Sequence, residues 1–369
     1  MRKFLLFAFL AIIFAIGITL YQKSSAPLFL PKINNNSETK VDSKTTEIIA
    51  ENLEIPWSIA FLPDGNFLFT ERPGNLNLFN LKTKEKTLIA KIDVALPGEG
   101  GLHGIEIDPE FITNNYVYIY YTYSGTGNNS LNRVERYKFT NNSLSDANIL
   151  IDAIPGASNH DGGRIKFGPD KFLYITTGDA QEPSKAQDRN SLAGKILRVT
   201  RDGNPAPENP FNTRVYSYGH RNPQGIVWDE NDNLYSTEHG RSGVLSGLDE
   251  LNLIESGKNY GWPEIEGNKE KSGMETPILN SGENDTWAPG GMTYFENKIY
   301  FAGLRGSALY IYDMGTKKLS LQFKNEFGRI RDVVLGPDNL LYITTSNRDG
   351  RGKIRGNDDK IIRINPEKL

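Results

Sequence analysis

Residues 163–179 read GRIKFGPDKFLYITTGD and contain two short runs of alternating residues on either side of a turn. Alternation with a period of two is typical of a strand with one buried face. Proline, aspartate and glycine between two such runs favour a hairpin. The same phrase returns five times along the chain, beginning at Trp57, Gly104, Gly225, Gly291 (a degenerate copy) and Asp332.

Six hairpin phrases, with almost no helical periodicity from residue 47 onward, predict an all-β, six-bladed β-propeller with one phrase per blade. A ring of blades must close, so KIIRINP from Lys360 is expected to share a blade with EIIAENLEI from Glu47. The stretch before APGGMTYF (288–295) is short, which predicts a trimmed fifth blade. A β-sandwich is the alternative, but it does not account for a phrase repeated six times.

The composition excludes several classes of function. Apolar residues make up 38% of the 369-residue chain, charged residues make up 24%, and there are 36 glycines, which fits a folded, turn-rich protein. The net charge is −3 and no basic cluster stands out, which argues against nucleic acid as a partner. The chain has no cysteine, so disulfides, thiolate metal sites and cysteine nucleophiles are excluded.

The N-terminus indicates export from the cytoplasm. Residues 4–21 carry no charge and follow Arg2 and Lys3. A helix of that length would span about 27 Å, close to the hydrocarbon core of a bilayer. The basic residues would keep the N-terminus inside, so residues 1–21 are expected to be a signal anchor or a cleaved signal peptide, with the anchor preferred. Residues 22–46 are then a flexible tether, and residues 47–369 form the propeller, at the cell surface or in the periplasm.

Polar residues that flank the hairpin phrases predict a site at one mouth of the propeller channel. His160 precedes the third phrase and Asp179 ends it, and a neutral histidine held by an aspartate is an oriented general base. Backbone carbonyls near Gly240, with acids nearby, suit Ca²⁺. Guanidinium groups from several blades would bind a polyanion, and the candidates are Arg221, Arg305, Arg329 and Arg331.

Eight motifs in the chain, in this order, resemble the family of sugar dehydrogenases that depend on pyrroloquinoline quinone (PQQ). That family includes soluble glucose dehydrogenase and the bacterial aldose sugar dehydrogenases, and the resemblance runs from about Leu53 to Ile364. The motifs are PWSIAFLPDGNFLFTERPG, GEGGLHGIEIDPEF, NHDGGRIKFGPD, LAGKILRV, GHRNPQG, DELN, NYGWP and GRIRDV. Each is weak alone, and together they are specific.

The resemblance implies a fold and an activity. It implies a six-bladed propeller with PQQ lying over the channel mouth, and oxidation of an aldose at its anomeric carbon to the lactone. His160 would take the proton of the anomeric hydroxyl while hydride passes to the quinone, and Asp179 would orient His160. Arg221 would polarise the quinone oxygens beside a Ca²⁺, with Asn222 in support. The electrons would then pass to an external acceptor.

The resemblance also implies a ligand set. The carboxylates of PQQ would meet Arg329 and Arg331, and Arg305 would contact the cofactor. Glu99 falls beside the sugar. The remaining expected ligands are those of calcium: backbone oxygens of Gly240 and Arg241 at the cofactor, and oxygens of Glu250 and Tyr260 at a second, structural ion.

Two departures from the family pattern and a few structural assignments complete the expectations. Arg241 stands where the family usually has proline, in a longer loop, and His103 replaces an apolar residue. His220 and His239 are expected to be structural, packing between blades. Three tryptophans are expected in blade cores, namely Trp57, Trp228 and Trp262.

Two other functions remain as alternatives. The chain could be a propeller that binds carbohydrate or protein without catalysis, or a calcium-dependent propeller lactonase. A pure binder has no reason to retain a base, its orienting acid and cofactor arginines together. A lactonase centres its metal on side-chain carboxylates and amides, whereas this mouth is expected to be rich in arginine. The sequence therefore favours the dehydrogenase.

Overall fold

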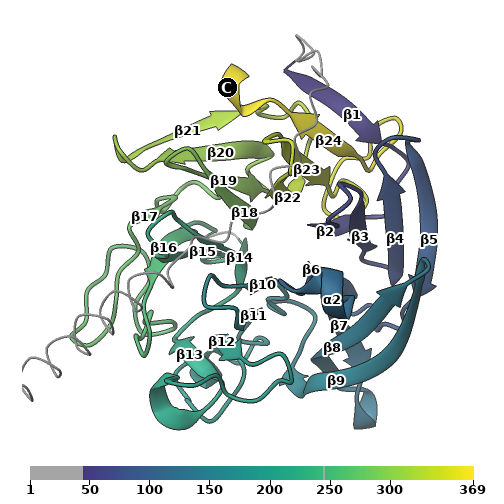
Figure 1. Ribbon diagram of the computed structural model, residues 1–369. Helices are drawn as coiled ribbons and strands as arrows, with labels where there is room; N and C mark the ends of the chain where they lie inside the picture. The colour runs from purple at the N-terminus through teal and green to yellow at the C-terminus, as the bar shows by residue number, and fades with distance from the viewer. Residues whose placement is uncertain (1–44, 244–245) are drawn as a thin grey trace, which may run out of the picture. The chain divides into compact units, whose positions relative to one another are not determined.

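The computed structural model describes residues 45–243 and 246–369, and it confirms the six-bladed β-propeller. Six four-stranded antiparallel sheets are arranged in a ring around a central channel (Figure 1). The first strand of each hairpin phrase lies nearest the centre of the ring. Because each phrase supplies the two inner strands of one blade, the residues flanking the phrases lie around the channel.

The first three blades follow one another along the chain. Blade one contains β2 (Pro56–Phe61), β3 (Phe67–Glu71), β4 (Asn75–Asn80) and β5 (Glu85–Lys91). Blade two contains β6 (Leu102–Ile107), β7 (Tyr116–Ser124), β8 (Ser130–Thr140) and β9 (Ser143–Pro155), with the short helix α2 (Phe111–Asn114) between β6 and β7. Blade three contains β10 (Ile165–Phe167), β11 (Leu173–Thr177), β12 (Lys195–Val199) and β13 (Val215–Tyr218).

The last three blades complete the ring. Blade four contains β14 (Pro223–Trp228), β15 (Leu234–Glu238), β16 (Glu250–Ile254) and β17 (Leu279–Asn280). Blade five contains β18 (Pro289–Phe295), β19 (Lys298–Gly303), β20 (Ala308–Asp313) and β21 (Lys318–Gln322). Blade six contains β22 (Ile330–Leu335), β23 (Leu341–Thr345), β24 (Ile361–Ile364) and β1 (Thr46–Ala50). Short 3₁₀ turns lie at Thr126–Asn128, Pro183–Ala186, Pro210–Asn212 and Pro366–Lys368.

Ring closure occurs where the sequence predicts it. Strand β1 pairs antiparallel with β24, with Thr46 opposite Ile364 and Ile48 opposite Ile362. The N-terminal strand thus completes the blade of the C-terminal strands. The prediction of a trimmed fifth blade is wrong, because β18–β21 are all present. The short outer strand is β17 of blade four, since residues 255–278 leave the sheet between β16 and β17.

A repeated tyrosine–aspartate hydrogen bond ties the inner hairpins at the ends away from the predicted site. The hydroxyl on the second strand donates to the aspartate of the preceding turn, in the pairs Tyr118–Asp108 (2.9 Å), Tyr174–Asp170 (2.9 Å) and Tyr342–Asp338 (3.0 Å). An aromatic ring of the next blade packs edge-on against each tyrosine. Phe167 packs against Tyr118, Trp228 against Tyr174, and Phe61 against Tyr342. Contacts of this kind contribute about 0.5–1.5 kcal/mol each beyond their buried area, so they fix the angle between blades.

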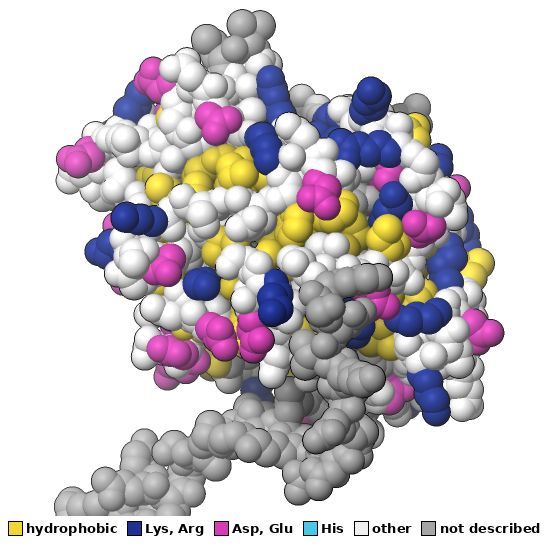
Figure 2. Space-filling model, turned by 90° about the horizontal axis from the view of Figure 1, so that it is seen from above, with side chains coloured by type: hydrophobic (Ala, Val, Ile, Leu, Met, Phe, Trp, Pro, Cys, Tyr) yellow, Lys and Arg dark blue, Asp and Glu magenta, His cyan; other side chains and the backbone are white. Residues whose placement is uncertain are grey.

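The predicted N-terminal helix at residues 1–21 and most of the tether lie outside the described residues. Within residues 45–243 and 246–369, no helix is long and apolar enough to cross a membrane. Figure 2 looks at the ring from its side, where acidic and basic side chains are scattered around apolar stretches that run across the middle of the view.

Candidate active site at the channel mouth

A cavity of about 520 Å³ lies where segments from five blades converge. It is reached by residues that enter or leave the inner strands of blades two to six. A cleft of this size, lined by a few convergent polar groups, is the usual form of a small-molecule site. Eight residues predicted from the sequence line it: Glu99, His160, Arg221, Gly240, Arg241, Arg305, Arg329 and Arg331.

His160 is held by Asp179, as the sequence predicts. The distance from His160 Nδ1 to Asp179 Oδ1 is 2.7 Å, and the aspartate is fully buried. The second carboxylate oxygen, Oδ2, accepts from the Trp262 indole at 2.8 Å. A carboxylate facing Nδ1 keeps the proton on that nitrogen and leaves Nε2 able to accept one.

The backbone around His160 explains the glycines of this motif. His160 has a φ of +67°, a left-handed conformation that is uncommon for a residue with a side chain. A Cβ on Gly178 would lie 1.8 Å from the carbonyl oxygen of His160, so only glycine fits there. Backbone strain that the surroundings enforce often marks a functional site.

Buried arginines with free hydrogen-bonding capacity line the same cavity. Arg331 donates from Nη1 to Gln224 Oε1 at 2.6 Å, and burial lowers its pKa to about 10 although Asp349 opposes that shift. Arg221 donates to the Ser242 hydroxyl at 2.8 Å. Within the described residues the Nε atoms of Arg221 and Arg331 are buried without a partner. An unpartnered buried donor is costly, so an anion in this cavity would restore the missing bonds.

Two further arginines complete this basic wall. Arg329 forms an ion pair with Asp349, with 2.8 Å between Nη2 and Oδ2. Arg305 is exposed at the rim of the cavity. The cavity therefore presents several cations to one volume, as the sequence predicts for a polyanionic ligand.

Glu99 lies beside His160 and is fixed by an ion pair that sequence reasoning missed. Its Oε1 accepts from Arg351, and its Oε2 is 3.3 Å from the backbone nitrogen of His160. Burial opposes ionisation of Glu99, but His239, Arg351 and Arg331 together hold its pKa at about 2. Glu99 is therefore a carboxylate at any physiological pH and accepts hydrogen bonds.

Residues 53–362 match the family model described as glucose/sorbosone dehydrogenase. The chain belongs to the glucose/sorbosone dehydrogenase family. The structure of the PQQ-bound form of the aldose sugar dehydrogenase from Streptomyces coelicolor is similar, with 38% identity, a TM-score of 0.80, and coverage of 86% of this chain and 97% of that one. A putative glucose dehydrogenase from Thermus thermophilus is similar at 41% identity and a TM-score of 0.80, with 87% and 99% covered. The aldose sugar dehydrogenase YliI of Escherichia coli is 29% identical over 82% of this chain and 90% of its own length.

Two of the predicted residues lie behind the cavity instead of lining it. Asp179 contacts His160 and does not line the cavity itself. Asn222 is buried, and its Oδ1 accepts from the backbone nitrogen of Gly162 at 3.0 Å, which supports the loop that carries His160. Its Nδ2 has no partner among the described residues, so a direct role toward a ligand stays a prediction.

The predicted calcium ligands divide between two places. Gly240 and Arg241 line the main cavity, whereas Glu250 and Tyr260 line a smaller pocket behind it. No group of three or more acidic or histidine side chains suited to a metal occurs in the part of the chain that the structure describes. Burial, with Glu238 nearby, raises the pKa of Glu250 to about 8. Both calcium sites stay predictions, and the donors that could serve are chiefly backbone oxygens.

The two histidines expected to be structural differ. His220 is fully buried between the Ser217 hydroxyl at 2.8 Å and Glu238 at 2.8 Å, as predicted. The prediction is wrong for His239, which lines the cavity with its Nε2 unpartnered within the described residues. Burial lowers its pKa to about 4, so it is neutral at pH 7 and can donate to or accept from a ligand. Its position directly after β15 is the signal that could have revealed it.

Proposed function

We propose that this glucose/sorbosone dehydrogenase oxidises an aldose at its anomeric carbon to the lactone, with PQQ as the bound hydride acceptor. The observation that carries the proposal is the convergence of the His160–Asp179 pair and four arginines on one cavity. A general base alone would suit many reactions. A base that shares its cavity with several guanidinium groups, two of which have an unpartnered Nε among the described residues, suits oxidation beside a flat tricarboxylate cofactor. A similar protein solved in its PQQ-bound form supports this choice.

The residues present fit PQQ. Arg221, Arg305, Arg329 and Arg331 would hold its carboxylates and quinone oxygens, because a guanidinium group pairs with a carboxylate through two parallel bonds. When bound, the quinone would accept the hydride, with its electron pair, from the sugar C–H bond. Each arginine is held in advance by Ser242, Gln224 or Asp349 or lies at the rim, so binding needs little reorganisation.

His160 would remove the proton of the anomeric hydroxyl. With the proton held on Nδ1 by Asp179, Nε2 would accept this proton, and Asp179 would stabilise the imidazolium that forms. The carboxylate of Glu99 accepts a hydrogen bond from a second sugar hydroxyl and thereby orients the ring. Loss of a proton to His160 and of a hydride to the quinone accounts for both electrons and both hydrogens removed when a lactone forms.

The remaining parts of the proposal concern calcium, the electron acceptor and location. Ca²⁺ at the carbonyls of Gly240 and Arg241 would help to hold the quinone. An external acceptor would take the electrons onward. We also propose that residues 1–21 direct the propeller out of the cytoplasm, and sequencing of the mature N-terminus distinguishes a retained anchor from a cleaved peptide.

The function is tested by adding PQQ and Ca²⁺ to the purified protein and measuring dye reduction with a panel of aldoses. We expect aldose-dependent reduction that chelation weakens and that His160→Ala abolishes while PQQ still binds. Binding of PQQ without turnover of any aldose would favour a non-catalytic carbohydrate- or protein-binding propeller. Failure of both binding and turnover would eliminate the dehydrogenase.

A further inference from the structure

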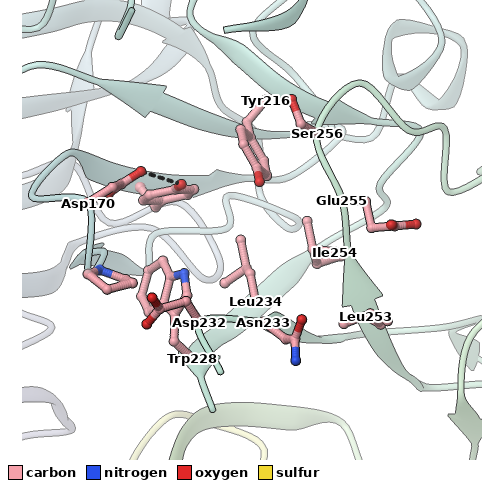
Figure 3. Close-up of a pocket in the computed structure, with 12 residues that line it drawn as sticks. Asp170, Tyr216, Trp228, Asp232, Asn233, Leu234, Leu253, Ile254, Glu255 and Ser256 are labelled. Atoms are coloured by element: carbon pink, nitrogen blue, oxygen red, sulfur yellow. Dashed lines mark hydrogen bonds between the residues drawn. The ribbon is translucent and has the colours of Figure 1, made fainter. Parts of the chain in front are cut away.

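A second cavity, of about 530 Å³, lies between blades three and four (Figure 3). It is formed by the β10–β11 turn and β13 on one side and by the β14–β15 turn and the end of β16 on the other. His160 and Asp179 flank the opposite ends of β10 and β11. The residues that line this cavity therefore take no part in the proposed oxidation.

Three aromatic rings form one wall of the cavity. The rings of Tyr216 and Trp228 each meet the ring of Tyr174 at 74°, with centroid separations of 5.2 and 4.9 Å. Figure 3 labels two of these rings, Tyr216 and Trp228, and shows Leu234 and Ile254 beside them. Leu234 and Ile254 are almost completely buried and form an apolar floor.

Two carboxylates at the rim form no ion pair among the described residues, although the charge of Lys258 acts on Glu255. Asp232 and Glu255 are exposed, and neither forms an ion pair within residues 45–243 and 246–369. The third acid of the cavity, Asp170, is already satisfied by Arg198 at 2.8 Å and by the Tyr174 hydroxyl. The cavity is thus aromatic and apolar inside and negative at its entrance.

Two other junctions between blades are crossed by ion pairs within the described residues. Between blades two and three, the guanidinium group of Arg201 crosses the junction and reaches Asp108 at 3.0 Å and Glu110 at 3.1 Å. Between blades six and one, Lys84 reaches Glu47 at 3.2 Å. Among the described residues no ion pair crosses the junction between blades three and four. At this cavity Arg198 pairs with Asp170, but within the described residues no basic side chain pairs with Asp232 or Glu255.

We propose that this cavity binds an organic cation, an ammonium or guanidinium group on an apolar stem. The charge would lie against the aromatic wall and near Asp232 and Glu255, which combines cation–π attraction with opposite charge. The stem would cover Leu234 and Ile254. A neutral sugar could also contact the rings, but it would bring no positive charge to either carboxylate.

A pair of isosteric probes tests the proposal on the purified full-length protein. Choline and 3,3-dimethylbutan-1-ol have nearly the same shape and differ in charge, so calorimetric titration with each isolates the contribution of the cation. We expect choline to bind at least tenfold more tightly, and its binding to weaken in 0.5 M salt. A third titration with Nα-acetyl-lysine methylamide distinguishes a free small molecule from a lysine side chain of a partner protein as the source of the cation.

Variants assign the binding to this cavity. Asp232→Asn/Glu255→Gln removes only exposed charge, so the protein should fold normally and lose choline affinity at least tenfold. The matched control, Glu85→Gln/Asp93→Asn on blade one, removes the same charge elsewhere and should bind as the wild type does. Trp228→Leu should abolish binding, with circular dichroism to verify folding. Equal binding of the two isosteres, tighter binding of glucose, absence of choline binding, or an unaffected Asp232/Glu255 variant would each overturn the proposal.

Discussion

Replacing Asp179 with asparagine tests how His160 is activated. The aspartate carboxylate accepts three hydrogen bonds: from His160 Nδ1 at 2.7 Å, from the Gln181 backbone at 2.9 Å and from Trp262 Nε1 at 2.8 Å. Asparagine has one acceptor oxygen. If that oxygen faces His160, the amide NH₂ opposes the Trp262 donor. If the amide is reversed, its NH₂ faces Nδ1 and moves the histidine proton to Nε2, which disables the base.

The size of the effect follows from those contacts. Losing a charge-assisted hydrogen bond to the imidazolium costs about 1.5–3 kcal/mol, or roughly 10- to 100-fold in rate. The asparagine also either faces the Trp262 donor with its own NH₂ group or places the histidine proton on Nε2, and either defect raises the barrier by a further ~1–3 kcal/mol. We therefore expect Asp179→Asn to lower kcat by about 10²–10⁴-fold, the usual contribution of an oriented general base. Binding of PQQ should be unchanged, because Asp179 does not line the cavity.

The assay is steady-state dye reduction by the PQQ-loaded enzyme as a function of aldose concentration. Trp262→Phe is the matched control, since it removes one bond to Asp179 but keeps the charge that faces His160. The control should cost about tenfold or less, because a single neutral donor contributes about 0.5–1.5 kcal/mol. An Asp179→Asn enzyme with kcat within a few-fold of the wild type, or no slower than the control, would refute the reasoning.

Three further predictions concern other groups. Arg331→Gln should weaken PQQ binding at least tenfold in a fluorescence titration, whereas Arg189→Gln, outside the cavity, should not. Arg351→Gln should raise the pKa of Glu99 from about 2 and raise KM for the sugar more than it lowers kcat. An unchanged KM would show that the Arg351–Glu99 ion pair has no part in substrate binding. Burial raises the pKa of Asp161 to about 7 from 3.8, so the folded state retains a proton that the unfolded state loses. The free energy of unfolding should therefore fall as the pH rises from about 4 to about 7. Asp161→Asn should flatten the fall of Tm over this pH range, and equal slopes of Tm against pH in the variant and the wild type would contradict the prediction.

The sequence predicts the inner part of the propeller well, and the reason is physical. The inner strands are buried on both faces or alternate clearly, so the hairpin phrases stand out, and a ring brings the residues at their edges to one mouth. The outer strands carry little signal. Strands β5 and β21 are largely exposed, so no apolar pattern marks them. This is why the complete fifth blade and the short β17 of blade four were not foreseen.

The part of the site that was missed comes from long connections. Arg351 lies between β23 and β24, and Trp262 lies in the excursion after β16. Each reaches a partner on another blade: Arg351 pairs with Glu99, and Trp262 donates to Asp179. Separations of this length along the chain carry no periodicity, so only the folded arrangement reveals them. His160 and Asp179 were accessible because one hairpin holds both.

The central claim is that arginines from separate blades hold one flat, triply acidic cofactor beside His160. An equilibrium titration of the purified protein with PQQ, followed by fluorescence, tests it most directly when repeated with Arg329→Gln/Arg331→Gln. The account predicts saturable binding of one quinone per chain that weakens with salt and is lost in the double variant. Absence of saturable binding, or equal affinity in the double variant, would contradict it.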